Sequence, residues 1–132
     1  MEKRSGNWMI VVGCFLLALA VALGAFGSHG IRGQISQDAF RIYDTMVTYL
    51  FYHSFALVIA GLIGRHRMNG WILWAGRLFS FGILFFCGSL LLLTVVKALV
   101  LPGFGWIGPI TPLGGVGFIG GWMSLAIGAL KK

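Results

Sequence analysis

The chain has 132 residues, of which 58% are hydrophobic and only 10% are charged. Soluble domains are typically about one quarter charged, so the composition excludes an ordinary water-soluble globular domain. The formal net charge of +7 comes from basic residues scattered between apolar runs, a pattern that favours contact with lipid headgroups over a nucleic-acid surface.

Four apolar runs take up most of the sequence. A bilayer core about 30 Å thick needs roughly 20 apolar residues in a helix, and we expect spans at approximately 8–27, 38–64, 71–96 and 113–130. The longest polar stretch, 28–45, is too short for a separate soluble domain. The sequence therefore predicts an all-α membrane protein, a four-transmembrane-helix bundle that forms a single integral membrane domain over 1–132.

The first run ends at 27–30, where glycines tolerate the turn conformations that close a helix. Its Ala20-Val21-Ala22 segment resembles a signal-peptide cleavage site. Because the apolar residues continue to bilayer length beyond this segment, we expect a retained helix.

The second run carries the most polar side chains. Ser36 is the expected N-cap, and Asp38 is favourable at the positive end of the helix. At about 100° per residue, one half of the helix collects Arg41, Asp44, Thr45, Thr48, Tyr49, Tyr52, His53, Ala56 and Ala60. Unpaired polar groups are costly in hydrocarbon, so this face should meet other helices or water.

The third and fourth runs are separated by a proline-containing segment, 98–112. We expect Phe104 and Trp106 to lie along the outer interface, with a re-entrant segment as the alternative. Small residues spaced about four apart permit close helix approach in lipid. The expected packing positions are Ala56, Ala60, Gly117, Gly120, Gly121 and Ser124, whether within one chain or between chains.

Basic residues are distributed unequally between the two sides of the four spans. One side holds Lys3, Arg4, Arg65, Arg67, Lys131 and Lys132, with Arg77 close to it, while the other holds Arg32, Arg41 and Lys97. Because basic residues concentrate in cytoplasmic loops, we expect both termini to be cytoplasmic. The expected location is the bacterial inner (plasma) membrane.

Four ordered motifs give the chain a family resemblance. They are GAFGSHG at 24–30, YHSFAL at 52–57, GILFFCGS at 82–89 and ITPLGG at 110–115. Together they resemble the YgdD-like family of small membrane proteins, a domain-of-unknown-function group with bacterial inner-membrane and animal mitochondrial members. The resemblance implies a compact four-helix membrane protein and supplies no catalytic residues.

A few ionisable side chains at membrane depth are candidate site residues. His29, Asp44, Tyr49, Tyr52 and His53 form a candidate polar intramembrane cluster. Such a cluster would order the loop against the bundle, or bind a polar headgroup, a quinone carbonyl or a proton. Arg77 either snorkels to the interface or contacts a headgroup or another anion.

The sequence contains no catalytic or nucleotide-binding motif, and its three acidic residues leave little material for acid–base chemistry. We therefore expect no enzyme activity, no metal and no cofactor. The expected role is that of a non-enzymatic accessory or partner-binding membrane protein. The alternatives are a small transporter or channel along the polar face of the second helix, and a lipid- or quinone-binding protein. The expected partners are the bilayer and either a second copy or another membrane protein, with no nucleic acid.

Overall fold

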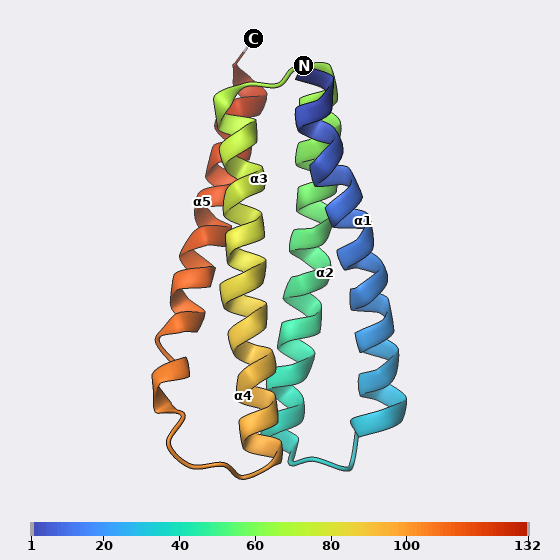
Figure 1. Ribbon diagram of the computed structural model, residues 1–132, viewed down its shortest axis with the longest axis vertical. Helices are drawn as coiled ribbons and strands as arrows, with labels where there is room; N and C mark the ends of the chain where they lie inside the picture. The colour runs from blue at the N-terminus through green and yellow to red at the C-terminus, as the bar shows by residue number, and fades with distance from the viewer. Residues whose placement is uncertain (1, 132) are drawn as a thin grey trace.

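The structure is a computed structural model that describes residues 2–131, with side chains from residue 6 onward. Helices account for almost all of the described chain, and no strand occurs in this part (Figure 1). The elements are α1 (Glu2–Phe26), η1 (Gly27–Ile31), α2 (Gln37–His66), α3 (Gly70–Gly82), η2 (Ile83–Cys87), α4 (Gly88–Ala98), η3 (Gly105–Ile107) and α5 (Ile110–Leu130). The predicted all-helical fold is confirmed.

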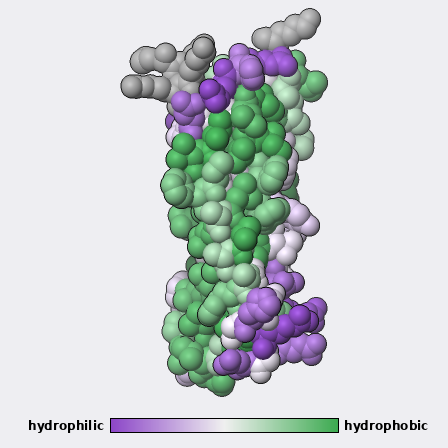
Figure 2. Space-filling view, turned by 90° about the vertical axis from the view of Figure 1, so that its right-hand side faces the viewer, coloured by the Kyte–Doolittle hydropathy of each residue, from purple (hydrophilic) through white to green (hydrophobic). Residues whose placement is uncertain are grey.

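These elements combine into four segments that are long and apolar enough to cross a membrane: Gly6–Ile31, Gln37–His66, Gly70–Ala98 and Gly105–Leu130. Each has at least 26 residues, which at 1.5 Å rise per residue exceeds the thickness of the hydrocarbon core. A broad apolar band separates polar side chains at the two ends of the molecule (Figure 2). Both termini lie at the same end (Figure 1).

The four spans form an open bundle. They run side by side in the order α5, α3–α4, α2, α1 (Figure 1), and each packs on the next along the chain. Helix α1 also touches α3, where the buried Met9 side chain packs on Gly76. Within the described residues α1 and α5 make no contact. The bundle is therefore a row of helices that does not close on itself.

Helices α1 and α2 approach each other backbone to backbone. A Cβ atom added to Gly61 would lie 2.8 Å from the Gly6 carbonyl oxygen, and one added to Gly13 would lie 2.9 Å from the Ser54 carbonyl oxygen. Lipid tails are as apolar as leucine, so helices in a membrane gain from such close van der Waals contact rather than from the hydrophobic effect. The glycines thus define the α1–α2 pair.

Helices α3 and α5 form a second close pair. A Cβ atom added to Gly117 would lie 2.8 Å from Phe81 Cδ1, and one added to Gly121 would lie 2.7 Å from Phe79 Cδ1. At Gly120 the same atom would make an ordinary 3.4 Å contact with Leu78. Ser124 is buried further along α5. These small residues of α5 face α3 within one chain.

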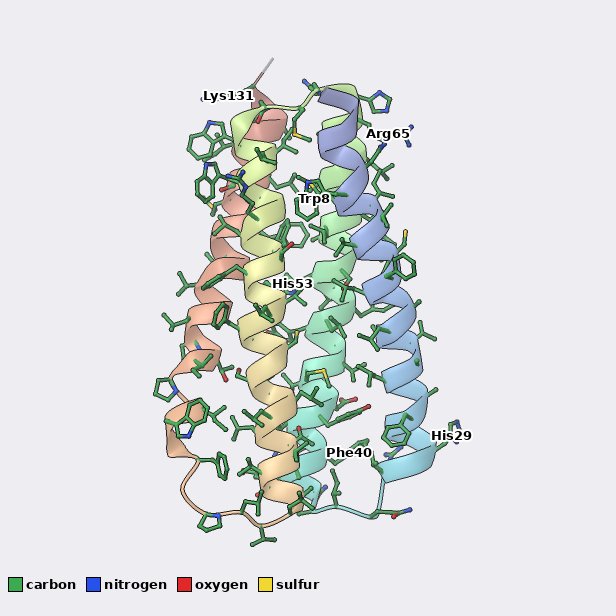
Figure 3. The ribbon with its side chains drawn as sticks, viewed as in Figure 1. Trp8, His29, Phe40, His53, Arg65 and Lys131 are labelled. Carbon is green, nitrogen blue, oxygen red and sulfur yellow. The ribbon has the colours of Figure 1, made fainter. Side chains whose placement is uncertain are left out.

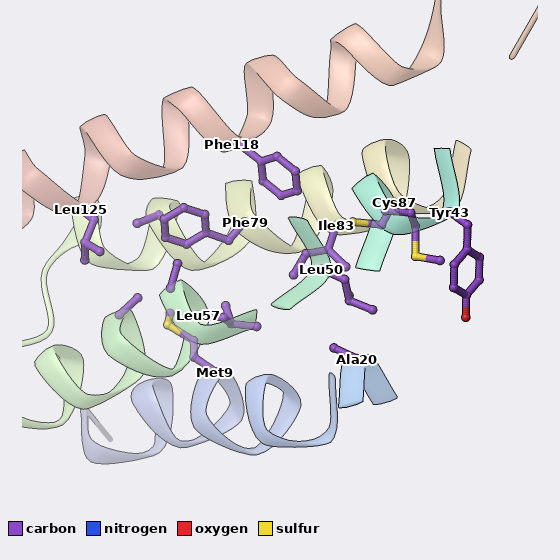
Figure 4. Close-up of a cluster of buried hydrophobic side chains, with 14 residues drawn as sticks. Met9, Ala20, Tyr43, Leu50, Leu57, Phe79, Ile83, Cys87, Phe118 and Leu125 are labelled. Carbon is purple, nitrogen blue, oxygen red and sulfur yellow. The ribbon is translucent and has the colours of Figure 1, made fainter. Parts of the chain in front are cut away.

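The core lies where the two helix pairs meet. Ala56 and Ala60 on α2 are fully buried in it. Figure 4 shows side chains from all four spans converging there, among them Met9, Ala20, Leu57, Phe79 and Phe118. A direct hydrogen bond of 2.7 Å between the hydroxyls of Ser89 and Thr111 adds a polar link between α4 and α5.

Two predicted helix boundaries have different outcomes. The Ser36 N-cap is confirmed, since its hydroxyl accepts a hydrogen bond from the Ala39 N–H at 3.2 Å. The expectation that the first helix closes at 27–30 is wrong, because the helical path continues to Ile31 as the π-turn η1. There the Tyr43 ring packs directly on Gly27, and its hydroxyl donates to the Leu23 carbonyl at 2.6 Å. This contact from α2 extends the helix past its glycines.

The connection at 98–112 turns at the end of the bundle, and its later part returns beside α4 (Figure 1). It contains η3, where Ile107 is buried while Trp106 is more than half exposed. This arrangement favours the interfacial placement over the re-entrant one. Val100 has a φ of 52°, a left-handed conformation that is strained for a β-branched residue.

The α1–α2 contact can be tested by substitution of one glycine. In Gly61→Ala the new methyl group would press on Ile10 and on the Gly6 carbonyl. Overpacking of this kind costs about 1–3 kcal/mol, and we expect a loss of that size in an SDS unfolding titration of the detergent-solubilised protein.

Gly88→Ala is the matched control, since a Cβ atom there meets no other atom within 4 Å. Alanine is a better helix former than glycine, so this variant should be neutral or up to about 1 kcal/mol more stable. Equal destabilisation by the two substitutions would contradict the close approach of α1 and α2.

Candidate functional site

A groove lies between α2 and α5 at mid-span, and its volume is about 520 Å³. Its walls are mostly aromatic and aliphatic, because α2 lines it with aromatic side chains and α5 adds Trp122. The lining residues are Tyr49, Phe51, Tyr52, His53, Phe55, Ala56, Ile59 and Trp122. An apolar groove with a few polar groups is the usual form of a site for a small lipophilic ligand.

His53 supplies the most distinctive polar atom of this groove. The side chain is 94% buried, and it lies near the middle of the molecule's length (Figure 3). Its Nδ1 lies 2.8 Å from the Tyr49 carbonyl oxygen. A carbonyl only accepts hydrogen bonds, so Nδ1 must carry the hydrogen. In the neutral ring Nε2 then keeps a lone pair, and among the described residues no partner donates to it.

Aromatic rings hold the His53 imidazole in this position. The Phe118 ring stacks on it, with 3.5 Å between centroids and 10° between planes. Tyr49 stacks on Phe86, a residue of the π-turn η2, at 4.7 Å, and Trp122 meets His53 with its edge at 6.2 Å. Stacking from several elements leaves the imidazole few alternative orientations.

The structure brings together only part of the candidate polar cluster. Tyr49, Tyr52 and His53 line one groove. His29 is exposed on η1, at the end of the bundle opposite the termini, and points outward (Figure 3). Asp44 is exposed on α2, more than two helical turns from His53, and its carboxylate makes no hydrogen bond with the described residues.

Sequence reasoning missed the aromatic partners of His53. Phe118 and Trp122 lie four residues apart on α5 and so share a helix face. That spacing is a usable signal, although the glycines around both residues indicate helix packing instead. Phe86 gave no signal, because its direction depends on the π-turn. Ser54 beside His53 is fully buried, and its hydroxyl has no partner among the described atoms.

Arg77 lies near a second groove, between α3 and α5 at the end that holds the termini. This groove has a volume of about 710 Å³ and is lined by Asn69, Gly70, Trp71, Trp74, Leu78, Ser124 and Lys131. Arg77 is exposed, and its guanidinium carbon lies 5.3 Å from the centre of the Trp74 ring. The Asn69 side chain ties the two helices together, donating to the Gly128 carbonyl at 2.9 Å while capping α3.

The two grooves differ in the chemistry that they offer. The α2–α5 groove combines apolar walls with the His53 imidazole and two phenols, which suits a neutral molecule with a polar head. The α3–α5 groove combines indole rings with cations at its edge. Among the side chains that the structure describes, no three of His, Cys, Asp or Glu are grouped closely enough to hold a metal ion.

Comparisons with known proteins relate this chain to one family of bacterial membrane proteins. Residues 23–115 match the family described as "Protein of unknown function (DUF423)". The UPF0382 membrane protein SERP0230 of Staphylococcus epidermidis is 42% identical over 123 residues, which cover 92% of this chain and 94% of that protein. The UPF0382 membrane protein YwdK of Bacillus subtilis is 40% identical, covering 92% and 95%. No solved structure matches the chain.

These relatives are named membrane proteins of bacteria, and four segments of the structure are long and apolar enough to span a membrane. The predicted location, a multi-pass protein of a bacterial membrane, is therefore confirmed. Both the family match and the full-length relatives lead to one conclusion: the chain belongs to the DUF423 family of membrane proteins, a family of unknown function.

Proposed function

We propose that this protein is a non-enzymatic membrane protein that binds a lipid-soluble molecule carrying a hydroxyl group in the α2–α5 groove. A quinol is the representative ligand. The observation that carries the proposal is the His53 ring, which lines an apolar groove while its Nδ1–H donates to the Tyr49 carbonyl, so that Nε2 is left as an acceptor without a partner among the described residues.

The tautomer selects the kind of ligand. A quinone carbonyl is an acceptor and would meet the lone pair of Nε2 unfavourably, whereas a quinol hydroxyl donates to it. The Tyr52 phenol in the same groove offers a second hydrogen bond. The groove opens beside α2 toward the membrane, so a ligand dissolved in the bilayer would enter sideways without crossing water.

A transporter or channel is less well supported by the same geometry. It requires a polar route from one end of the bundle to the other along α2. Tyr49 and Tyr52 are exposed on the side of the bundle, and the aromatic rings of Phe79, Phe118 and Trp122 fill the space next to His53. This arrangement favours lateral binding.

Quinol binding can be measured through the fluorescence of Trp122, which lines the groove. We expect decylubiquinol to quench it saturably in the detergent-solubilised protein, with decylubiquinone binding more weakly. A hydrogen bond contributes about 0.5–1.5 kcal/mol, so His53→Phe should weaken quinol binding by roughly 3- to 10-fold while it keeps the ring stacked on Phe118.

Two controls make this test specific. The dimethyl ether of the quinol lacks the hydroxyl donors and should bind wild type and His53→Phe equally. Trp122→Phe identifies the part of the signal that comes from the groove. Equal affinity of wild type for the quinol and its dimethyl ether, or no saturable quenching at all, would refute the proposal.

The cytoplasmic location of both termini is a further part of the proposal. The end that holds the termini also carries Arg65 and Lys131 (Figure 3), with Arg67 at the C-cap of α2, and a basic end is typical of the cytoplasmic side. An alkaline phosphatase domain fused at the C-terminus should be inactive, and one inserted after Gly33 should be active. The reverse result would place both termini on the side opposite the cytoplasm.

The motifs at 24–30 and 52–57 also support a YgdD-like assignment within the family.

Self-association is the second candidate role, and α1 is the helix that supports it. In the most apolar stretch of this span only 17% of the residues are buried, against 44% in the corresponding stretch of α2. Its uncovered side presents small residues four apart, Cys14, Ala18 and Ala22, a spacing that permits close contact between helices. A second copy, or another membrane protein with a similar stripe, would fit there.

Cys14 makes this role directly testable, because it is exposed on α1 whereas Cys87 is buried. Mild oxidation of native membranes should produce a disulfide-linked dimer in wild type and in Cys87→Ser, and none in Cys14→Ser. Ala18→Leu should reduce the yield several-fold by separating the helices. A dimer that persists in Cys14→Ser, or no dimer at all, would speak against an α1–α1 contact.

A further inference from the structure

We propose that the α3–α5 groove is a binding site for one anionic phospholipid from the leaflet on the side of the termini. This site is separate from the proposed α2–α5 site. It combines an apolar slot open to the bilayer with two cations at the depth of the headgroups.

The walls of the slot are suited to an acyl chain and the glycerol region. Trp71 and Trp74 of α3 line it together with Leu78, and Ser124 of α5 closes the inner side. Trp71 is 39% exposed and Trp74 is 55% exposed. Indole rings prefer the zone between headgroups and hydrocarbon, so two of them on one wall mark the depth at which a lipid would lie.

Two cationic side chains make cation–π contacts with these indole rings. Lys131 Nζ lies 5.2 Å from the centre of the Trp71 ring, and Arg77 Cζ lies 5.3 Å from that of Trp74. Contact with the ring faces orients both side chains along the groove. Arg77 lies two turns into α3, roughly 10 Å from the helix start at 1.5 Å rise per residue, and its long side chain can reach the interface.

Among the described side chains, no carboxylate lies near the charge of the groove. Asp38 and Asp44, the two carboxylates among the described side chains, both lie in the first part of α2, at the opposite end of the bundle. Arg77 and Lys131 therefore present positive charge toward the bilayer surface. A phosphodiester with net negative charge complements them, and arginine is well suited to phosphate oxygens.

The slot itself is rigid. The Asn69 side chain bridges α3 and α5 at the end of the groove through the Gly128 carbonyl, and a Cβ atom added to Gly128 would lie 2.8 Å from Ile72 Cγ1. Helices held this closely keep the two walls of the slot at a fixed separation. A preformed site loses less entropy when a lipid binds.

Native mass spectrometry tests the proposal with two lipids of equal chain length, dioleoylphosphatidylglycerol and dioleoylphosphatidylcholine. The wild-type protein should retain phosphatidylglycerol at least 5-fold more tightly. The double variant Arg77→Gln/Lys131→Gln should lose most of this preference. Brominated phosphatidylglycerol in vesicles should quench Trp71 and Trp74 in wild type and less in the double variant.

Arg41→Gln/Lys97→Gln is the matched control, since it removes the same charge at the other end of the bundle and should leave the preference intact. His53→Phe should also leave it intact, so failure here is distinguishable from failure of the proposed quinol site. The proposal is overturned by an unchanged lipid preference in Arg77→Gln/Lys131→Gln, or by an equal loss in the control pair.

Discussion

The close approach of helix backbones at glycine is the constraint on which the rest of this structure depends. A membrane gives apolar helices no hydrophobic reason to associate, so contact area between them must supply the stability. Gly6, Gly13 and Gly61 bring α1 against α2, and Gly117 and Gly121 bring α5 against α3. The protein is thus built from two tight pairs, and larger side chains such as Phe79 and Leu57 fill the seam between them.

An open row of helices has consequences for chemistry. Because α1 does not return to cover α5, the polar and aromatic face of α2 is left on a side of the bundle. Tyr49, Tyr52 and His53 then line a groove in place of a closed core. Polar atoms at this depth are unfavourable without partners, and the structure satisfies one imidazole nitrogen within α2 while the other has no partner among the described residues.

Aromatic rings set the geometry of both grooves. Phe118 and Phe86 fix the imidazole and the Tyr49 phenol by stacking. At the end of the bundle Trp71 and Trp74 play a related part, since each holds a cation over its face. Aromatic side chains lose little entropy on ordering for the contact area that they provide. In lipid they position polar groups that hydrogen bonds alone would leave mobile.

The sequence by itself determined the membrane class, the number of spans, the Ser36 cap and the small-residue spacing of α5, because hydrophobic length and local capping act within one segment. It did not determine which helices are neighbours across the row. The tertiary structure decided that His29 and Asp44 lie apart from His53, that Phe118 stacks on it, and that Tyr43 extends the first helix past Gly27. Each of these depends on a contact between spans, and no periodicity within a single span encodes the partner across it.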